Sequence, residues 1–105
     1  MINTIKQLFG LGPGIDYVDL MKKGAIILDV RSKNEYAGGH IEGSINISVD
    51  ILNNNHSNLK DKNRPIITCC ASGMRSATAK SILRAKGYKE VYNGGSWHGL
   101  QNKIK

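Results

Sequence analysis

The chain has 105 residues and a formal net charge of +7, from 15 lysines and arginines against 8 acidic residues. At this length about two thirds of the surface of the unfolded chain is buried on folding, which supports one core and excludes a second domain. With 40% hydrophobic residues the chain is not disordered throughout, and no apolar run approaches the ~20 residues of a membrane span. We expect a single domain over residues 1–105 with a short N-terminal extension, residues 1–13. Because that extension is a poor signal peptide, we expect a cytoplasmic location.

The only two cysteines, Cys69 and Cys70, are adjacent. Neighbouring Cα atoms lie about 3.8 Å apart, closer than in relaxed disulfides, so a structural disulfide between them is not expected. His40, His56 and His98 are scattered and lack the spacing of a metal site, so no metal is expected. The cysteines are therefore predicted to be free thiols in a reducing compartment.

Short apolar runs predict the strands of a sheet. Residues 25–30 and 65–69 are continuous apolar runs, typical of strands buried on both faces, and residues 44–47 and 90–92 are shorter candidates. Residues 53–62 are polar and lack periodicity, which predicts an exposed loop. Helical segments separate the runs, and this alternation predicts an α/β fold with a mainly parallel sheet covered by helices on both faces.

Start and stop signals predict four helices. Polar N-cap residues, an amphipathic spacing and terminal glycines place them over residues 16–23, 32–39 and 75–86, and from Ser96 onward. Ser32 and Glu35 have the spacing of a capping box at the start of the second helix. The third is the clearest, because its apolar side chains follow the helical spacing and Gly87 ends it. Its apolar stripe consists of Ala79, Ile82 and Leu83.

The candidate chemistry lies where the second apolar strand leads into the third helix, in residues 70–76, which we call the Cys70 loop. Ligands bind at such turns in open α/β sheets, because backbone N–H groups and the helix N-terminus concentrate positive potential there. Gly73 permits a backbone conformation that other residues resist, and Arg75 adds a full positive charge. The predicted anion-binding residues are Ala71, Ser72, Gly73, Met74, Arg75 and Ser76.

This setting is expected to lower the pKa of the Cys70 thiol. A fall of about two units from 8.5 would raise the thiolate fraction at pH 7 from ~3% to roughly three quarters. Cys70 is therefore the candidate nucleophile. Cys69 lies inside the strand, so its side chain is expected to point away from Cys70 and to be inert.

Two stretches of the chain resemble the rhodanese (thiosulfate sulfurtransferase) family in its single-domain form. They are L-D-V-R at residues 28–31, followed by E-Y at 35–36, G-H-I at 39–41, G-S at 43–44 and Ile47, and the Cys70 loop with its helix, followed by V-Y-N-G-G at 91–95. The resemblance runs from about Asp16 to the end of the chain. It implies a rhodanese-like fold, with a mainly parallel five-stranded sheet and helices on both faces.

The resemblance also implies a reaction. The Cys70 thiolate would take sulfane sulfur from an anionic donor such as thiosulfate, and the resulting persulfide would pass it to cyanide or a thiol. No cofactor is expected beyond this covalent persulfide. Four residues separate Cys70 from Arg75, whereas related phosphatases and arsenate reductases have five, and the tighter loop favours one sulfur atom over a phosphate.

Other residues of the matching stretches are interpreted as structural. A carboxylate beside the thiolate would raise the pKa of the cysteine, so Asp29 and Arg31 are assigned to the support of the site, as a brace. Trp97 is a departure from the family, because many relatives have their tryptophan where Gly99 stands. Because of this shift, the sequence does not determine where the final helix starts or which residues form the apolar wall beside the site.

The alternatives to an enzyme are a non-catalytic rhodanese-type interaction module and a sulfur-relay carrier whose acceptor is a protein partner. Interaction modules usually lack the cysteine, so Cys70 argues against the first. The positive charge is attributed to attraction of small anions or of an acidic partner protein. No nucleic acid or membrane partner is expected, because the cations are dispersed from Lys6 to Lys105 without interleaved aromatics. The expected partners are a small anionic sulfur donor and a cyanide or thiol acceptor, such as a thioredoxin-like protein.

Overall fold

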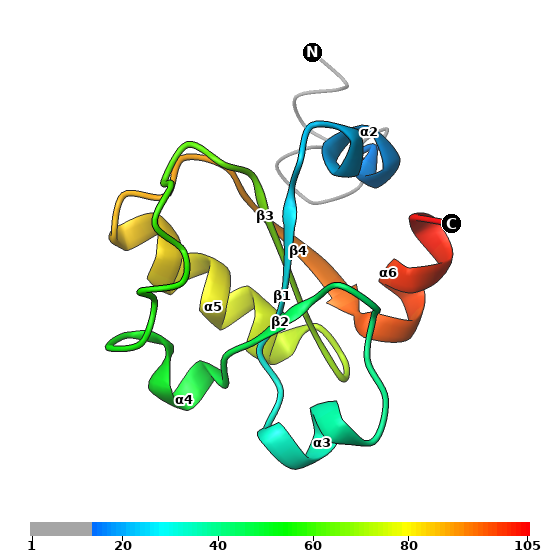
Figure 1. Ribbon diagram of the computed structural model, residues 1–105, viewed down its shortest axis with the longest axis horizontal. Coiled ribbons are helices and arrows are strands. Elements are labelled where there is room, and N and C mark those ends of the chain that lie inside the picture. The colour runs from blue at the N-terminus through cyan, green and yellow to red at the C-terminus, as the bar shows by residue number, and fades with distance from the viewer. Residues whose placement is uncertain (1–13) are drawn as a thin grey trace.

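The computed structural model of the protein describes residues 14–105, so the predicted N-terminal extension lies outside the described residues. The elements are α2 (Tyr17–Lys22), β1 (Ile26–Asp29), α3 (Lys33–Ala37), β2 (Ile45–Asn46), α4 (Val49–Leu52), β3 (Ile66–Cys70), α5 (Met74–Ala85), β4 (Val91–Ser96) and α6 (Trp97–Lys103) (Figure 1). Within this range no helix is both long and apolar enough to cross a bilayer.

The strands form one parallel sheet in the order β2-β1-β3-β4. Leu28 of β1 lies opposite Ile45 of β2 and Thr68 of β3, and Thr68 lies opposite Asn93 of β4. Because the strands are parallel, all of their carboxyl ends meet at one edge of the sheet. This edge carries α3 and the Cys70 loop, at the bottom of Figure 1.

The predicted α/β architecture is confirmed, with one correction to the number of strands. Residues 14–105 form four strands rather than five. The four apolar runs of the sequence each supply one of these strands. The remaining long segment, residues 53–62, forms turns because it lacks the apolar alternation that a strand requires.

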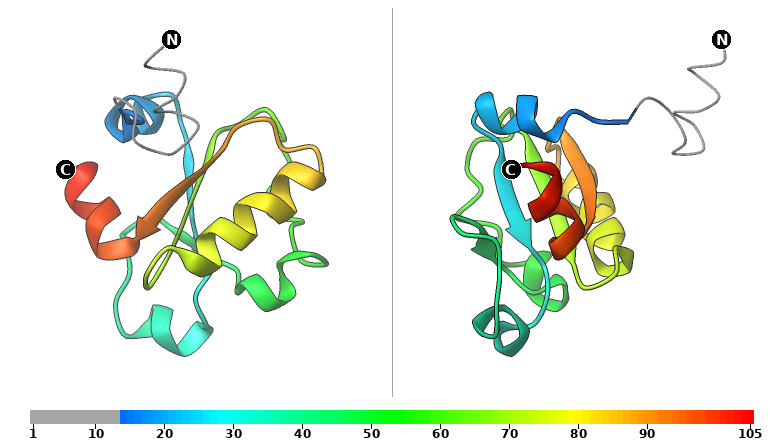
Figure 2. Two further views of the ribbon diagram at one scale, coloured as in Figure 1. Left: turned by 180° about the vertical axis from the view of Figure 1, so that it is seen from behind. Right: turned by 90° about the vertical axis from the view of Figure 1, so that its right-hand side faces the viewer.

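The sheet is covered on both faces, as predicted. Figure 1 shows α4 and α5 on one side and α2 and α6 on the other, and the view from behind in Figure 2 shows the same division. Alternate residues of β3 enter the two cores: Ile66 and Cys70 pack with Leu83 of α5, whereas Ile67 and Cys69 pack with Leu100 of α6. The two cysteine side chains therefore point to opposite faces, as the strand geometry predicts.

The predicted N-caps are present. The Asp19 N–H donates to Asp16 Oδ1 (3.0 Å), and the Gly99 N–H donates to Ser96 Oγ (3.1 Å). Ser32 and Glu35 form the expected capping box, each backbone N–H donating to the side chain of the other. These hydrogen bonds satisfy N–H groups that a helix start leaves unpaired, so α2, α3 and α6 begin at their predicted positions.

The segment 53–62 is less exposed than predicted. Leu59 is 1% exposed and belongs to the core beneath α5, and its carbonyl accepts a hydrogen bond from the Tyr88 hydroxyl. One apolar side chain is enough to fix a polar loop to the core when it fills a space between packed elements. The short helix α4, which precedes this loop, was not predicted.

Candidate active site

Cys70 is the last residue of β3, and the Cys70 loop turns from it into α5. The turn depends on Gly73, which has a φ of +104° and serves as the N-cap of α5. That left-handed conformation is strained for residues that carry a Cβ. The turn brings the first backbone N–H groups of α5 toward the Cys70 thiol, which is fully buried.

Hydrogen bonds converge on the Cys70 sulfur. The Gly73 N–H donates to Sγ (2.9 Å), and Ser76 Oγ lies 3.5 Å from Sγ. Burial alone would raise the pKa of this thiol. The Ser76 hydroxyl and the N–H groups of Ser76, Gly73 and Ser72 outweigh that effect, so the pKa of Cys70 lies below its ordinary value. The loop therefore favours the thiolate, the nucleophilic form of cysteine.

Asn93 of β4 holds this arrangement in place. Its Oδ1 accepts a hydrogen bond from the Gly95 N–H (2.9 Å) and one from the Ser76 hydroxyl (2.6 Å), and its Nδ2 donates to the Gly73 carbonyl (3.2 Å). From the next strand, the Thr68 hydroxyl donates to the Ser76 carbonyl (2.9 Å). The loop is therefore fixed by side chains of β3 and β4. The sequence analysis missed Asn93 as a site residue, although Asn-Gly-Gly is a recognisable turn signal.

The Ser76 hydroxyl has only one proton to donate. When Cys70 is protonated, its S–H donates to Ser76 Oγ and the hydroxyl donates to Asn93 Oδ1 (2.6 Å), the nearer of two acceptors, the other being the Gly73 carbonyl (3.0 Å). When Cys70 is ionised, the hydroxyl can turn from Asn93 to the sulfur, because a hydrogen bond to an ion is stronger than one to a neutral amide. A rotation of the Ser76 hydroxyl would then be enough to serve both protonation states.

Arg75 is engaged by an acidic residue of α3. Its guanidinium forks the carboxylate of Glu35, with Nη1–Oε1 at 2.7 Å and Nη2–Oε2 at 2.9 Å. The fork, together with hydrogen bonds to Ser32, holds the pKa of Glu35 well below its usual range. An anion bound to Arg75 would therefore share it with Glu35 or displace Glu35. The sequence assigned Glu35 only to a capping box, and nothing local predicts a contact 40 residues away.

Asp29 and Arg31 form a buried ion pair at the end of β1. Arg31 Nη2 donates to Asp29 Oδ2 (2.7 Å) and to the Gly39 carbonyl (2.7 Å), and Arg31 Nε lies 2.9 Å from Asp29 Oδ1. The indole ring of Trp97, the first residue of α6, lies over the Arg31 guanidinium, with 4.8 Å between the ring centroid and Arg31 Cζ. The displaced tryptophan thus covers this pair. A bracing effect of the pair on the Cys70 loop remains a prediction.

Cys69 has a different environment. Burial, followed by the nearby Asp29 carboxylate, raises the pKa of its thiol to about 12. Cys69 is therefore protonated at neutral pH, and its pKa is shifted in the direction opposite to that of Cys70. The other predicted loop residues lie outward, since Ala71 and Ser72 are exposed and the Met74 side chain is 79% exposed.

One feature outside the Cys70 loop is a hollow, and a second question is whether any residues could hold a metal ion. A hollow of about 320 Å³ between α3, β2 and α4 is lined by residues such as Lys33, Asn46 and Asn58, none of which belongs to the Cys70 loop. In the described part of the chain, no three His, Cys, Asp or Glu side chains gather closely enough to hold a metal ion. The site therefore centres on the Cys70 sulfur, which main-chain and side-chain hydrogen bonds hold.

Comparison with known proteins places this fold and site. Residues 16–103 match the rhodanese-like domain family, and the chain belongs to that family. It is 38% identical over 85 residues to the uncharacterized protein YqhL of Bacillus subtilis, covering 77% of this chain and 64% of that relative, which is less than two thirds of its length. It is 38% identical over 77 residues to the thiosulfate sulfurtransferase GlpE of Pseudoalteromonas translucida, covering 70% of each. The solved structure of a rhodanese from E. coli superposes with a TM-score of 0.69 at 31% identity, covering 72% of this chain and 91% of that one.

Proposed function

We propose that this protein is a sulfurtransferase that moves sulfane sulfur from thiosulfate, or a related anionic donor, through a persulfide on Cys70 to cyanide or a thiol. The observation that carries the proposal is the buried Cys70 sulfur with the Gly73 N–H at 2.9 Å and Ser76 Oγ at 3.5 Å. Relatives named thiosulfate sulfurtransferase support this class of reaction.

In the first step, the Cys70 thiolate attacks the outer sulfur of thiosulfate. A bond forms between Sγ and that sulfur, the sulfur–sulfur bond of the donor breaks, and its electron pair leaves on sulfite. Thiolate and thiosulfate become persulfide anion and sulfite, so the total charge is unchanged and no proton moves. Arg75 and the N–H groups at the start of α5 offset the repulsion between the two anions.

In the second step, the acceptor attacks the outer sulfur of the persulfide. The sulfur–sulfur bond breaks and its electron pair returns to Sγ, which regenerates the thiolate. Cyanide leaves as thiocyanate, and a thiolate acceptor leaves as its own persulfide anion. The hydrogen bonds from Gly73 and Ser76 stabilise the returning charge, and Cys70 therefore acts as a leaving group as well as a nucleophile.

One observation favours a protein thiol as acceptor, as in a sulfur-relay carrier. Met74 is 79% exposed between Gly73 and Arg75, at the rim of the loop. An exposed, flexible thioether offers an adaptable apolar contact to a macromolecule, which a small acceptor such as cyanide does not need. A non-catalytic interaction module is disfavoured, because hydrogen bonds that stabilise a thiolate have no purpose in it.

Intact-mass spectrometry after treatment with thiosulfate tests this proposal. The wild-type chain is expected to gain the mass of one sulfur atom and to lose it on addition of cyanide. Cys69→Ser is the matched control and should behave like the wild type, whereas Cys70→Ser should gain nothing. No gain in the wild type, or equal loss of the gain in both variants, would overturn the proposal.

A further inference from the structure

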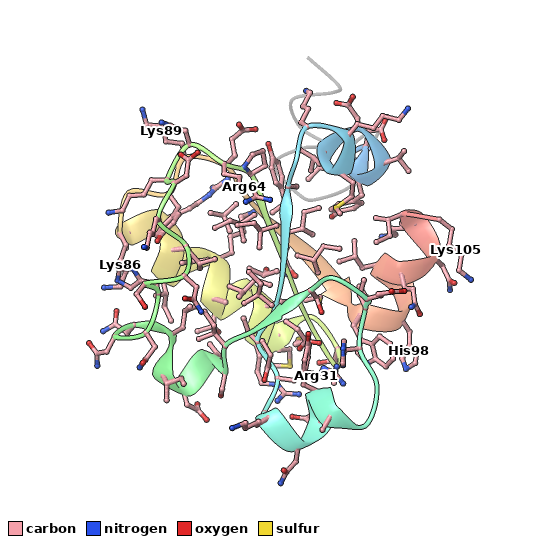
Figure 3. All side chains as sticks on the ribbon, in the orientation of Figure 1. Arg31, Arg64, Lys86, Lys89, His98 and Lys105 are labelled. Carbon is pink, nitrogen blue, oxygen red and sulfur yellow. The ribbon has the colours of Figure 1, made fainter. Side chains whose placement is uncertain are left out.

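The fold gathers positive charge at the end of the sheet opposite the Cys70 loop. The segments that precede β1, β3 and β4 all lie at the amino edge, because the strands are parallel. We call their cations the basic end, which consists of Lys22, Lys23, Lys60, Lys62, Arg64, Lys86 and Lys89. The acidic residues of the same segments are Asp16, Asp19, Asp61 and Glu90, and Lys23 Nζ is paired with Asp19 Oδ2 (3.0 Å). Figure 3 shows Arg64, Lys86 and Lys89 on this side of the molecule and Arg31 at the opposite end.

Hydrogen bonds join the three segments into one surface. Arg64 Nε donates to the Gly24 carbonyl (2.6 Å), which ties the segment before β3 to the one before β1. Lys62 Nζ donates to the Lys86 carbonyl (2.6 Å), and the Lys89 N–H donates to the Lys62 carbonyl (3.0 Å). Lys62 and Arg64 remain exposed. These hydrogen bonds tie the three segments together and hold the side chains of Lys62 and Arg64 in place.

Attraction of a small anionic donor does not explain this charge. β3 leads from the basic end to Cys70, and its five residues span about 13 Å at ~3.3 Å per residue. That separation exceeds the Debye length of ~8 Å at physiological salt, so the potential of the basic end is largely screened at Cys70. At the carboxyl edge, Arg75 is paired with Glu35 and Arg31 is paired with Asp29.

We propose that the basic end is a docking surface for an acidic protein, which it binds while Cys70 stays free at the other end of the sheet. This proposal does not depend on the sulfurtransferase reaction. Charge complementarity of this kind speeds encounter and selects the orientation of a partner. Of the two explanations for the net charge that the sequence leaves open, the arrangement favours the acidic partner.

Two observations favour a protein over a nucleic acid. Tyr88, an aromatic residue beneath the basic end, is 3% exposed and has Lys62 Nζ 5.5 Å from its ring centroid, so no base can stack on it. Tyr92 is half-buried, and its hydroxyl donates to Glu90 (2.9 Å), whose carboxylate would repel the phosphates that accompany a stacked base. The exposed acids Asp61 and Glu90 interrupt the cations. They would repel a row of phosphates, whereas a protein surface of mixed charge can pair with them.

The first test maps binding on the wild-type chain. Amide resonances are followed by NMR while poly-L-glutamate, the probe for an acidic polypeptide, is titrated in. The largest shifts are expected in residues 60–64 and 86–89, with smaller ones in residues 70–76. Shifts centred on residues 70–76, or spread evenly over the chain, would overturn the proposal. This measurement needs no variant.

The second test compares two variants of equal net charge. Lys89 is exposed and Lys86 is half-buried. Lys86→Glu/Lys89→Glu should weaken binding of poly-L-glutamate about ten-fold, since each reversal replaces an attraction by a repulsion. The control Lys33→Glu/Lys105→Glu should weaken it less than three-fold. Equal weakening in both variants would show that only the net charge of the protein matters. Tighter binding of polyuridylate than of poly-L-glutamate to the wild-type chain would assign the surface to nucleic acid. Either result overturns the proposal. The gain of sulfur mass at Cys70 should be the same in the wild type and in Lys86→Glu/Lys89→Glu. Failure of the docking proposal can therefore be distinguished from failure of the sulfurtransferase proposal.

Discussion

Replacing Ser76 by alanine tests how the loop stabilises a thiolate. Ser76 Oγ lies 3.5 Å from Cys70 Sγ, and the Ser76 side chain is fully buried. The substitution removes the hydroxyl and leaves the backbone N–H groups of the loop in place. If the hydroxyl donates to the ionised sulfur, its loss destabilises the thiolate more than the thiol.

The size of the effect follows from the strength of such a bond. A hydrogen bond to a charged group contributes about 1.5–3 kcal/mol, and one pKa unit corresponds to about 1.4 kcal/mol. The pKa of Cys70 should therefore rise by about one to two units in Ser76→Ala. The Gly73 N–H, at 2.9 Å, should keep part of the original depression.

The assay is the rate of alkylation by iodoacetamide as a function of pH, which reports the thiolate fraction. Both proteins carry Cys69→Ser, so that the signal comes from Cys70 alone. Ser81→Ala is the matched control, because Ser81 is an exposed serine of the same helix. An unchanged pKa in Ser76→Ala, or an equal rise in Ser81→Ala, would refute the role given to the Ser76 hydroxyl.

Three further predictions concern the charge at the site, the packing beneath it and the dependence of stability on pH. In a thiosulfate–cyanide assay, Arg75→Ala should raise the KM for thiosulfate and lower kcat/KM about 10- to 100-fold. Glu35→Gln should lower the KM for thiosulfate about two- to five-fold, because it frees Arg75. A higher KM in Glu35→Gln would mean that Glu35 orients Arg75. A Cβ at Gly94 would lie 2.9 Å from each of three atoms, so Gly94→Ala should reduce the free energy of unfolding in urea by about 1–3 kcal/mol, and Gly38→Ala, which meets nothing closer than 3.4 Å, should not. Because folding lowers the pKa of Cys70 below its ordinary value, the free energy of unfolding of the wild type relative to Cys70→Ser should rise with pH between the folded and unfolded pKa values of the thiol. Below the folded pKa the difference should no longer change with pH. A difference that falls with pH in this window would contradict the direction of the shift.

The features that the sequence predicts well are local. Capping by Asp16, Ser32 and Ser96 depends on residues within one helical turn. The turn at Gly73 and the opposite orientations of Cys69 and Cys70 follow from strand alternation and from a strand that leads directly into a helix. Each of these features is written into a few consecutive residues, so composition and spacing are sufficient to find it.

The features that the sequence analysis missed depend on tertiary contacts. Glu35 meets Arg75 across 40 residues, and Asn93 reaches Gly73 and Ser76 from the last strand. Leu59 is buried within a polar loop because of its neighbours in space. The basic end is likewise dispersed along the chain and is assembled only when parallel strands bring their preceding loops together. No local periodicity encodes such contacts.

The most direct test of the central claim is the titration of the Cys70 thiol in one Cys69→Ser chain, once folded and once unfolded in urea. The loop hydrogen bonds exist only in the folded state, so the comparison isolates their effect from that of the covalent sequence. We expect the alkylation profile to give a lower pKa in the folded chain than in the unfolded chain. A folded-state pKa equal to or above the unfolded value would contradict the proposal that the loop activates Cys70 as a nucleophile.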